Sequence, residues 1–272
     1  MIDSRSFRIG WRTAALLALA APALGSTQAG SLDLALYGRL LEEYTVETPA
    51  TVGTAVDYTG LARSAAWRKL IFQLGRARPE RVVDRRETLA FWINAYNILA
   101  IQVVLDHYPV DSIRDIGSFL RPVWKREAGR VAGEPVTLHA VEHEILRKLG
   151  EPRIHAAIVC ASTSCPSLAR TPYTARGLDA ELAAATRGWL ASPSKGAALD
   201  RTGRSIRLSR IFDWFEEDFD AGGGVLAFVA DHLPADDAAW LRQNATRVDV
   251  EYFDYDWTLN DAARVASDDP RN

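Results

Sequence analysis

The sequence predicts an α+β fold: a predominantly helical single domain around a small, mostly antiparallel sheet. Three observations support this prediction. Apolar residues recur at helical spacing along most of the chain, whereas segments typical of strands are few and short. Two pairs of these short segments flank turn-forming residues, a pattern typical of hairpins. The chain is 48% hydrophobic and 25% charged, which is typical of a globular protein.

The first half of the chain is expected to be mostly helical. We predict helices over residues 31–44, 61–74 and 86–107, and a loop with an extended piece over 46–58. Ser31 is placed to cap the first helix, and Pro109 ends the third. Because this third helix is apolar almost all round, we expect it to be central. A loop or short helix over 112–119 then leads to a hairpin over 123–136 that turns around Ala128-Gly129.

The second half of the chain is expected to mix helices with short strands. We predict helices over residues 138–149, 175–190, 210–217, 225–232 and 236–244. Thr137 and Ser209 are placed to cap the first and third of these helices. The apolar run 154–160 is typical of a buried strand, and 247–252 is typical of a last strand. Residues 197–200 and 205–208 are expected to pair as a second hairpin around 201–203.

The N-terminus is typical of a signal peptide. Arg5, Arg8 and Arg12 form a basic start, and a following apolar run of about a dozen residues is too short to span a bilayer comfortably. Small residues after the run predict cleavage, so we expect residues 1–29 to be the signal peptide. An uncleaved membrane anchor is the alternative interpretation. We expect one globular domain over residues 30–265 and a polar tail over 266–272.

The mature chain is expected to be exported, and therefore periplasmic or secreted. Removing residues 1–29 would take away three Arg and one Asp, which moves the net charge from −3 to −5. An acidic exported domain with scattered charges argues against nucleic acid as a partner. No later segment approaches the roughly 18 uninterrupted apolar residues of a membrane-spanning helix, so no transmembrane helix is expected after signal removal. The chain has no phosphate loop and no G-x-G-x-x-G or G-x-S-x-G motif, and no cofactor is predicted.

Both cysteines lie in one short segment, Cys160-Ala-Ser-Thr-Ser-Cys165-Pro166. In an exported protein, two cysteines indicate a disulfide, which here would close a short loop and contribute about 2 kcal/mol. The other interpretation makes Cys165 a nucleophile. Proline favours the first position of a helix, so Cys165 could cap a short helix whose positive end lowers the pKa of its thiol. Cys160 would then be a small buried residue. A plain buried thiol at Cys165 is a third interpretation, and all three remain open.

Motifs spread over roughly residues 55 to 260 resemble one family. They are Val56-Asp57-Tyr58, Phe91-Trp92-Ile93-Asn94-Ala95-Tyr96-Asn97, Ser112-Ile113-Arg114-Asp115-Ile116-Gly117, Val141-Glu142-His143, Arg153-Ile154-His155, Ser164-Cys165-Pro166, Tyr173, Ser209-Arg210-Ile211-Phe212, and Tyr255-Asp256-Trp257 with Asn260. On these motifs the chain is similar to bacterial members of the domain-of-unknown-function family 547. That family has no established activity, so the resemblance indicates site residues without indicating a reaction.

His143 is the partner for Cys165 that the resemblance indicates. A thiolate and a nearby imidazole are the minimal machinery of acyl transfer, and Asn94 could hold the oxyanion. Glu142 is expected to point elsewhere on the helix than His143. Orienting or substrate-binding roles are predicted for Asn97, Glu142, His155, Asp256 and Asn260. For Asn94 and Asn97, a purely structural role as buried amides is the alternative.

The segment His139-Ala-Val-Glu142-His143 also matches the H-x-x-E-H pattern of a class of zinc proteases. Two histidines four residues apart on a helix can share one metal ion. No later segment stands out as the source of a third ligand, and His139 is not part of the family's pattern. We therefore predict no metal site.

Two functional hypotheses follow. The first is an exported cysteine hydrolase or transferase that acts on an amide or thioester through Cys165 and His143. A papain- or transglutaminase-like architecture would suit this hypothesis, by analogy of fold alone. The second is a non-catalytic binding or interaction domain of the cell envelope with a structural Cys160–Cys165 disulfide. A redox role is weaker, because C-x4-C lacks the C-x-x-C spacing. The partner under either hypothesis is an unknown small molecule, peptide or envelope component.

Overall fold

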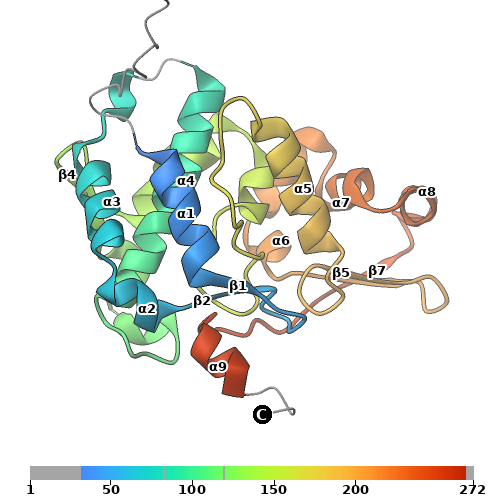
Figure 1. Ribbon diagram of the computed structural model, residues 1–272. Helices are drawn as coiled ribbons and strands as arrows, with labels where there is room; N and C mark the ends of the chain where they lie inside the picture. Colours follow the sequence, from blue (N-terminus) through green and yellow to red (C-terminus); the bar gives the residue numbers. More distant parts are fainter. Residues whose placement is uncertain (1–31, 82–83, 119, 268–272) are drawn as a thin grey trace, which may run out of the picture.

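Helix α4 (Arg85–Leu105) lies at the centre of the fold, as its apolar pattern predicts (Figure 1). The computed structural model describes residues 32–81, 84–118 and 120–267, and in these ranges the chain is mostly helical with three small sheets. The predicted α+β class is confirmed. By length and composition alone α4 could cross a membrane, but 78% of its most apolar window is buried inside the protein. The predicted signal peptide lies outside the described residues.

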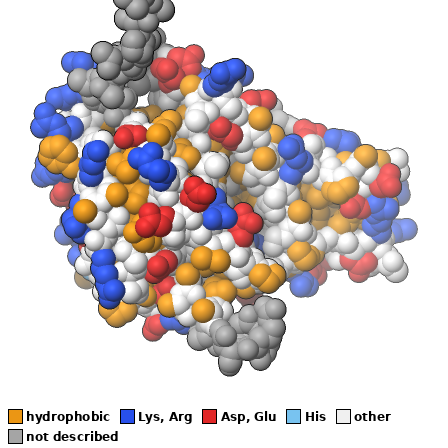
Figure 2. Space-filling view, viewed as in Figure 1, with side chains coloured by type: hydrophobic (Ala, Val, Ile, Leu, Met, Phe, Trp, Pro, Cys, Tyr) orange, Lys and Arg blue, Asp and Glu red, His pale blue; other side chains and the backbone are white. Residues whose placement is uncertain are grey.

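Two apolar cores hold the elements together. The larger core surrounds α4 and includes side chains from α1 (Leu34–Tyr44) and α3 (Ala65–Arg76). The smaller core joins α5 (Leu178–Leu190) to the last helices and to the three-stranded sheet. Figure 1 shows α1, α3 and α4 grouped on one side of the molecule and α5, α7 and α8 on the other. Acidic and basic side chains are interspersed on the face that Figure 2 shows.

The N-terminal elements differ from the prediction in three places. Asp33, not Ser31, caps α1, and Ser31 lies outside the described residues. The expected loop over 46–58 is an antiparallel hairpin of two short strands, followed by a helix that begins at its end. The predicted helix over 61–74 is two helices, because Ser64 is extended and accepts a hydrogen bond from the N–H of Trp67. These elements are β1 (Thr45–Glu47), β2 (Thr54–Val56), α2 (Tyr58–Arg63) and α3.

The predicted hairpin in the middle of the chain is confirmed, but its turn lies further along. Strands β3 (Glu127–Val131) and β4 (Glu134–Thr137) pair antiparallel and turn at Ala132-Gly133, where both residues have positive φ. The predicted turn at Ala128-Gly129 is wrong, because these residues lie inside β3 at an irregularity of its register. Two short 3₁₀ turns, η2 (Ile113–Ile116) and η3 (Val123–Lys125), precede the hairpin.

The segment after β4 departs most from the prediction. Thr137 accepts a hydrogen bond from the N–H of Ala140, as expected of a cap. The chain then forms a π-helix, η4 (Ala140–Leu146), and one 3₁₀ turn, η5 (Arg147–Leu149), in place of a regular α-helix. π-helical turns are rare and are frequent at functional sites.

The predicted buried strand over 154–160 is wrong. Its first residues belong to a 3₁₀ turn, η6 (Pro152–Ala156), and no strand pairs with the rest. The side-chain amide of Asn97 on α4 takes the place of a partner strand. It donates to the carbonyl of Ala157 at 2.9 Å and accepts from the N–H of Val159 at 2.8 Å. A side chain of the helix thus makes the backbone hydrogen bonds that a neighbouring strand was expected to make.

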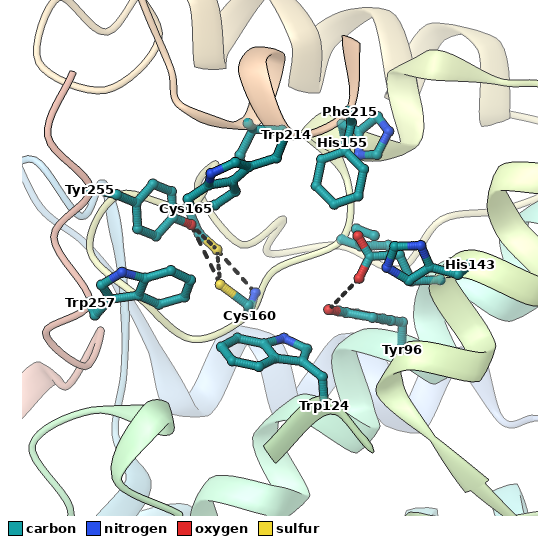
Figure 3. Close-up of a pocket in the computed structure, with 13 residues that line it drawn as sticks. Tyr96, Trp124, His143, His155, Cys160, Cys165, Trp214, Phe215, Tyr255 and Trp257 are labelled. Atoms are coloured by element: carbon teal, nitrogen blue, oxygen red, sulfur yellow. Dashed lines mark hydrogen bonds between the residues drawn. The ribbon is translucent and has the colours of Figure 1, made fainter. Parts of the chain in front are cut away.

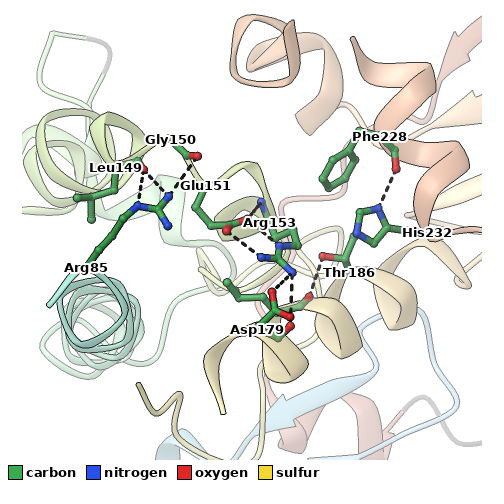
Figure 4. A network of polar contacts seen from close by, with 10 residues as sticks. Arg85, Leu149, Gly150, Glu151, Arg153, Asp179, Thr186, Phe228 and His232 are labelled. Carbon is green, nitrogen blue, oxygen red and sulfur yellow. Dashed lines mark hydrogen bonds and ion pairs between the residues drawn. The ribbon is translucent and has the colours of Figure 1, made fainter. Parts of the chain in front are cut away.

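Arginine side chains fix the chain between the π-helix and this segment (Figure 4). Arg85, at the start of α4, donates to the carbonyl of Leu149 at 2.6 Å. Arg153 pairs with Glu151 at 2.7 Å and with Asp179 of α5 at 2.9 Å. The π-helix and the chain that follows it are therefore tied to both groups of helices.

The second half largely follows the prediction. The hairpin of β5 (Ala197–Asp200) and β6 (Ser205–Leu208) is confirmed, whereas β7 (Asp249–Tyr252) pairs with β6 in parallel. The predicted helix over 210–217 is a single α-helical turn followed by a 3₁₀ segment. The remaining elements are α5, α6 (Ile211–Trp214), η7 (Glu216–Gly222), α7 (Val225–His232), α8 (Ala235–Asn244) and α9 (Ala262–Ser267).

Candidate functional site

A cavity of about 290 Å³ carries both cysteines in its wall (Figure 3). Its lining comes from α4, the π-helix, the cysteine loop (residues 160–165), α6 and the segment after β7, so distant parts of the sequence meet here. The lining residues are Tyr96, Trp124, Glu142, His143, His155, Ile158, Cys160, Cys165, Ile211, Trp214, Phe215, Tyr255 and Trp257.

The cysteine loop is held in place by the segment that follows β7. The N–H of Thr163 donates to the carbonyl of Thr258 at 2.8 Å, and the hydroxyl of Thr163 donates to the same carbonyl at 3.0 Å. This pairing carries Tyr255 and Trp257 to the cavity. The segment that contains Tyr255 and Trp257 therefore has a structural role, because it forms one wall of the site.

The two sulfur atoms are in direct contact. They lie 2.6 Å apart, and the backbone N–H of Cys160 donates to Sγ of Cys165 at 3.1 Å. The hydroxyl of Tyr255 lies 3.2 Å from Sγ of Cys165 and 3.5 Å from Sγ of Cys160. Ser162 donates to this hydroxyl at 3.1 Å. Cys165 therefore has a backbone donor and a phenol donor aimed at its sulfur.

These contacts give the two thiols different acidities. Burial raises the pKa of Cys165, but hydrogen bonds from Cys160, Ser162 and Tyr255 outweigh burial and lower this pKa to about 6. The hydrogen bond with Cys165 raises the pKa of Cys160 well above its ordinary value, and burial adds to this rise. One sulfur of the pair, Cys165, therefore carries the negative charge near neutral pH.

The expected origin of this low pKa is wrong. No helix begins at Pro166, because residues 166–169 are irregular, so Cys165 is not a helix cap. Its thiolate is stabilised by local hydrogen bonds in place of a helix end. Both cysteines are free thiols in the structure. The predicted disulfide stays a prediction, although little movement separates the two sulfur atoms from a bond.

Glu142 extends from the π-helix into the cavity wall. The wide π-turn brings both Glu142 and His143 to the cavity, so the expectation that Glu142 points elsewhere is wrong. Its carboxylate accepts a hydrogen bond from the hydroxyl of Tyr96 at 3.3 Å. Burial raises the pKa of Glu142, and although the Tyr96 hydrogen bond acts against burial, the result is about 7. Near neutral pH this group can therefore give or take a proton.

His143 lines the same cavity, but one of its two ring nitrogens is already hydrogen-bonded. Arg147 donates from Nη1 to Nδ1 of His143 at 2.8 Å, which leaves the imidazole proton on Nε2. Burial lowers the pKa of His143 to about 4, helped by the neighbouring His139 and Arg147. The ring is thus neutral at pH 7, and in the described structure it makes no hydrogen bond to either sulfur. Figure 3 shows the cysteines and His143 on opposite sides of the cavity.

His155 is buried behind the aromatic wall. Its Nε2 lies 2.7 Å from Oδ2 of Asp218, and its ring stacks on Phe215 with centroids 4.4 Å apart. Burial lowers the pKa of His155, although Asp218 acts against this. Asp218 also accepts from Arg147, so the two helical segments that carry the histidines are joined through one carboxylate. This role is consistent with the predicted orienting function.

The predicted asparagine residues lie outside the cavity lining. Asn94 donates to the carbonyl of Tyr173 at 2.8 Å and accepts from the N–H of Tyr173 at 3.0 Å. Asn97 makes the same pair of bonds to the segment before Cys160. The structure thus places both amides as braces of the backbone, and Asn94 does not reach a position where it could hold an oxyanion in the cavity.

Asp256 and Asn260 also act on the backbone and do not line the cavity. Asp256 is exposed and accepts a hydrogen bond from the N–H of Thr258. Asn260 is buried and accepts from the hydroxyl of Tyr58 at 2.6 Å. Both residues shape the segment that holds the cysteine loop. Their predicted orienting role is therefore indirect.

Several site residues could not be recognised from the sequence. Tyr96 and Tyr255 lie within motifs that carry the family resemblance, but nothing in the local sequence assigns either of them, or Ser162, an action on Glu142 or on the sulfur atoms. Lys195 is buried behind the cysteine loop and donates to the carbonyls of Val52 at 2.8 Å and Thr163 at 3.4 Å. Burial lowers its pKa to about 8. A buried lysine is an unusual signal, but its partners are visible only in three dimensions.

The candidate zinc pattern does not converge on a metal geometry. The rings of His139 and His143 have centroids 4.3 Å apart and are tilted by 33°. Within residues 32–81, 84–118 and 120–267, no group of three or more His, Cys, Asp or Glu side chains is arranged to hold a metal ion.

One comparison with known proteins agrees with the sequence motifs. Residues 81–190 match the family described as "Protein of unknown function, DUF547". The matched range covers α4, the π-helix, both cysteines and α5, and the predicted resemblance is confirmed for this segment. Trp214, Tyr255 and Trp257 lie beyond the matched range. No curated protein and no solved structure matches the chain, so a papain- or transglutaminase-like architecture stays a prediction.

Proposed function

We propose that this protein is a thiol-dependent hydrolase or transferase that acts on an amide or thioester through Cys165. One observation carries the proposal: Sγ of Cys165 lies in a cavity wall and accepts hydrogen bonds from the N–H of Cys160 and the hydroxyl of Tyr255. A thiol with a pKa of about 6 is mostly thiolate at neutral pH. Such a thiolate is a nucleophile without help from a neighbouring base.

The groups across the cavity suit the remaining steps. In the first step, the thiolate adds to the carbonyl carbon, and the bond to the leaving amine or thiol breaks. Glu142, whose pKa is about 7, gives its proton to the leaving group and later takes one from the attacking water or acceptor. The new thioester at Cys165 is cleaved in that second step, which restores the free thiolate. His143 is neutral, and its Nε2–H is a donor for the developing oxyanion.

The test is turnover of a panel of amide and thioester substrates. Cys165→Ala should fold normally and lose turnover, because no other sulfur has the same donors. Cys160→Ser is the matched control, since it keeps the backbone N–H that donates to Cys165 and a side-chain donor beside the sulfur. Unchanged turnover in the Cys165 variant would refute the proposal.

The second candidate function is a non-catalytic binding domain with a structural disulfide. The sulfur separation of 2.6 Å favours it, since the cysteines need little movement to join. We also propose that the chain is exported to the periplasm or secreted, on the strength of its basic and apolar N-terminus, and such compartments favour disulfides. Under this function, Cys165→Ser lowers the melting temperature by several degrees. Free thiols are counted by intact mass in protein that was never reduced, which distinguishes the form with two free thiols from the form with a disulfide.

A further inference from the structure

Aromatic rings enclose the cavity on several sides. Trp124 and Trp257 meet edge to face with ring centroids 5.5 Å apart, and Trp214 and Tyr255 are tilted at 48° with centroids 4.8 Å apart. Phe215 adds a ring near His155. Trp214 and Trp257 are nearly parallel, with 19° between their planes and centroids 5.7 Å apart. Trp124 and Tyr255 stand at angles to Trp257, so the rings form a wall that turns a corner in place of one flat stacking surface. Figure 3 shows the open space between Trp124 and Trp214.

The charges that face this volume are negative. Cys165 carries a thiolate and Glu142 a carboxyl group, whereas no Lys or Arg is among the described residues that line the cavity. The two lining histidines are neutral for the reasons given above. Arg147 lies behind His143, and its guanidinium is already bound to Asp218 and Glu217. The neighbouring cation is therefore compensated by two carboxylates.

Glu142 makes no ion pair among the described residues, and Arg147, the cation that acts on it, is bound to Asp218 and Glu217. The side chain of Glu142 is buried, and among the described residues its hydrogen-bond partner is the neutral hydroxyl of Tyr96. A buried carboxylate is costly unless it is paired. Aromatic faces attract cations through the ring quadrupole, and the combination of several rings with a carboxylate is the usual recognition site for alkylated ammonium groups. Arg114 shows this attraction at the same cluster, with its guanidinium carbon 5.1 Å from the Trp257 centroid.

We propose that the cavity binds an alkylated ammonium group, so that the substrate is an amide or thioester that carries an organic cation. Trp124, Trp214, Trp257 and Tyr255 would enclose the cation. Glu142 would neutralise it in its ionised form, and the protonated form, which is present in part near pH 7, would remain the proton donor of the proposed reaction. The inference rests on the proposed function only for the amide or thioester, since the binding of the cation needs no reaction at Cys165. At about 290 Å³, the cavity is at the lower end of small-molecule sites, about 300–1,000 Å³, so the cationic group must be small.

The test compares two probes of the same shape. Choline carries a trimethylammonium group, and 3,3-dimethyl-1-butanol replaces its charged nitrogen by carbon. Binding to the full mature chain is measured by calorimetry and by tryptophan fluorescence. We expect choline to bind at least about tenfold more tightly, the effect of a desolvated cation on aromatic rings. Equal affinities, or no binding of choline, would overturn the proposal.

Variants assign the effect to named residues. Glu142→Gln should reduce the preference for choline about tenfold, whereas Glu144→Gln, at an exposed position on the same π-helix, should leave it unchanged. Trp214→Leu should weaken choline binding, and Trp240→Leu on α8 is its control. Trp214 is 45% exposed, so this change should not prevent folding. If neither pocket variant changes the preference, the site of binding is elsewhere and the proposal fails.

Measurements of choline binding and of turnover distinguish the proposed cation site from the proposed enzyme. The same titrations are made with Cys165→Ser, which keeps the aromatic rings and Glu142. Selective choline binding without turnover of any substrate would support the cation site and count against the enzyme. Turnover that depends on Cys165, together with equal affinity for the two probes, would support the enzyme and refute the cation site.

Discussion

The backbone N–H of Cys160 points at Sγ of Cys165, with 3.1 Å between the nitrogen and the sulfur. The donor belongs to the peptide and not to the side chain, so it survives any substitution of Cys160 other than proline. The thiolate of Cys165 is thus stabilised by the same residue that could also close a disulfide with it. The Cys160 thiol also lowers the pKa of Cys165, and more strongly than the backbone N–H does, so a substitution that is meant to remove only the disulfide must keep a side-chain donor at residue 160.

The first prediction concerns the pH dependence of alkylation. In Cys160→Ser only one thiol remains, and the serine hydroxyl takes the place of the Cys160 thiol as a side-chain donor to Cys165. The rate of reaction of Cys165 with iodoacetamide should therefore rise with pH up to about 6 and then level off. The reason is that the thiolate is the reactive form, and the hydrogen bonds lower the pKa of Cys165 to about 6. An ordinary thiol would keep gaining rate up to about pH 8.5. Intact mass measured against time from pH 5 to 9 gives the profile.

Tyr255→Phe in the same background should move that profile to higher pH, because it removes the phenol donor 3.2 Å from the sulfur. At pH 6, labelling should become several times slower. Tyr252→Phe is the matched control, since Tyr252 lies on β7 outside the cavity. A profile that stays at pH 6 without the Tyr255 hydroxyl would show that the donors at residues 160 and 162 set the acidity.

The second prediction concerns the brace between α4 and the cysteine segment. Asn97→Ala should lower the free energy of unfolding by about 3 kcal/mol, because it leaves the buried carbonyl of Ala157 and the buried N–H of Val159 without partners. Urea denaturation followed by circular dichroism measures the change. Asn244→Ala removes a single hydrogen bond, from the side-chain amide of Asn244 to the carbonyl of Trp240 at the end of α8. This change should lower the free energy of unfolding far less. Equal losses in the two variants would contradict the role of Asn97 as a brace.

The sequence predicts the fold where a local pattern decides the structure. The central helix, the second hairpin and the helices near 225–244 depend on apolar spacing and turn residues, and these are confirmed. The run 154–160 shows the limit. Its apolar residues suit a strand, but the partner of its backbone is Asn97, some sixty residues earlier and on a helix. A pattern that is read along the chain cannot reveal a partner that only packing provides.

The candidate site shows the same division. The sequence identifies Cys160, Cys165, Glu142, His143 and His155 as residues with chemistry, and all five line one cavity. It does not predict which groups act on the thiol. Tyr255 reaches Cys165 only because the chain after β7 pairs with the cysteine loop. The π-turn that brings Glu142 into the cavity also has no signal in the local sequence, because a regular helix would satisfy the same apolar spacing.

The last prediction concerns the stability of the protein between pH 5 and pH 8. Burial raises the pKa of Glu142 from 4.5 to about 7, so the folded protein holds a proton that the unfolded chain releases. Because the pKa of Glu142 is raised in the folded state, its contribution to the free energy of unfolding is fully present below pH 4.5. This contribution is lost as the pH rises through 7. A shift of this size corresponds to about 3 kcal/mol. Glu142→Gln cannot lose a proton, so its stability should not fall in this way.

The comparison must be made between variants, because other groups titrate in the same range. His143 has a pKa lowered to about 4, so it contributes in the opposite sense and favours the fold as the pH rises from 4 to 6.5. Its effect is common to both proteins and cancels in their difference. From pH 5 to pH 8, the free energy of unfolding of Glu142→Gln should therefore rise relative to that of the wild-type protein. Urea denaturation at both pH values measures this gain, and a difference that does not change with pH would show that Glu142 is ionised in the folded state at pH 5.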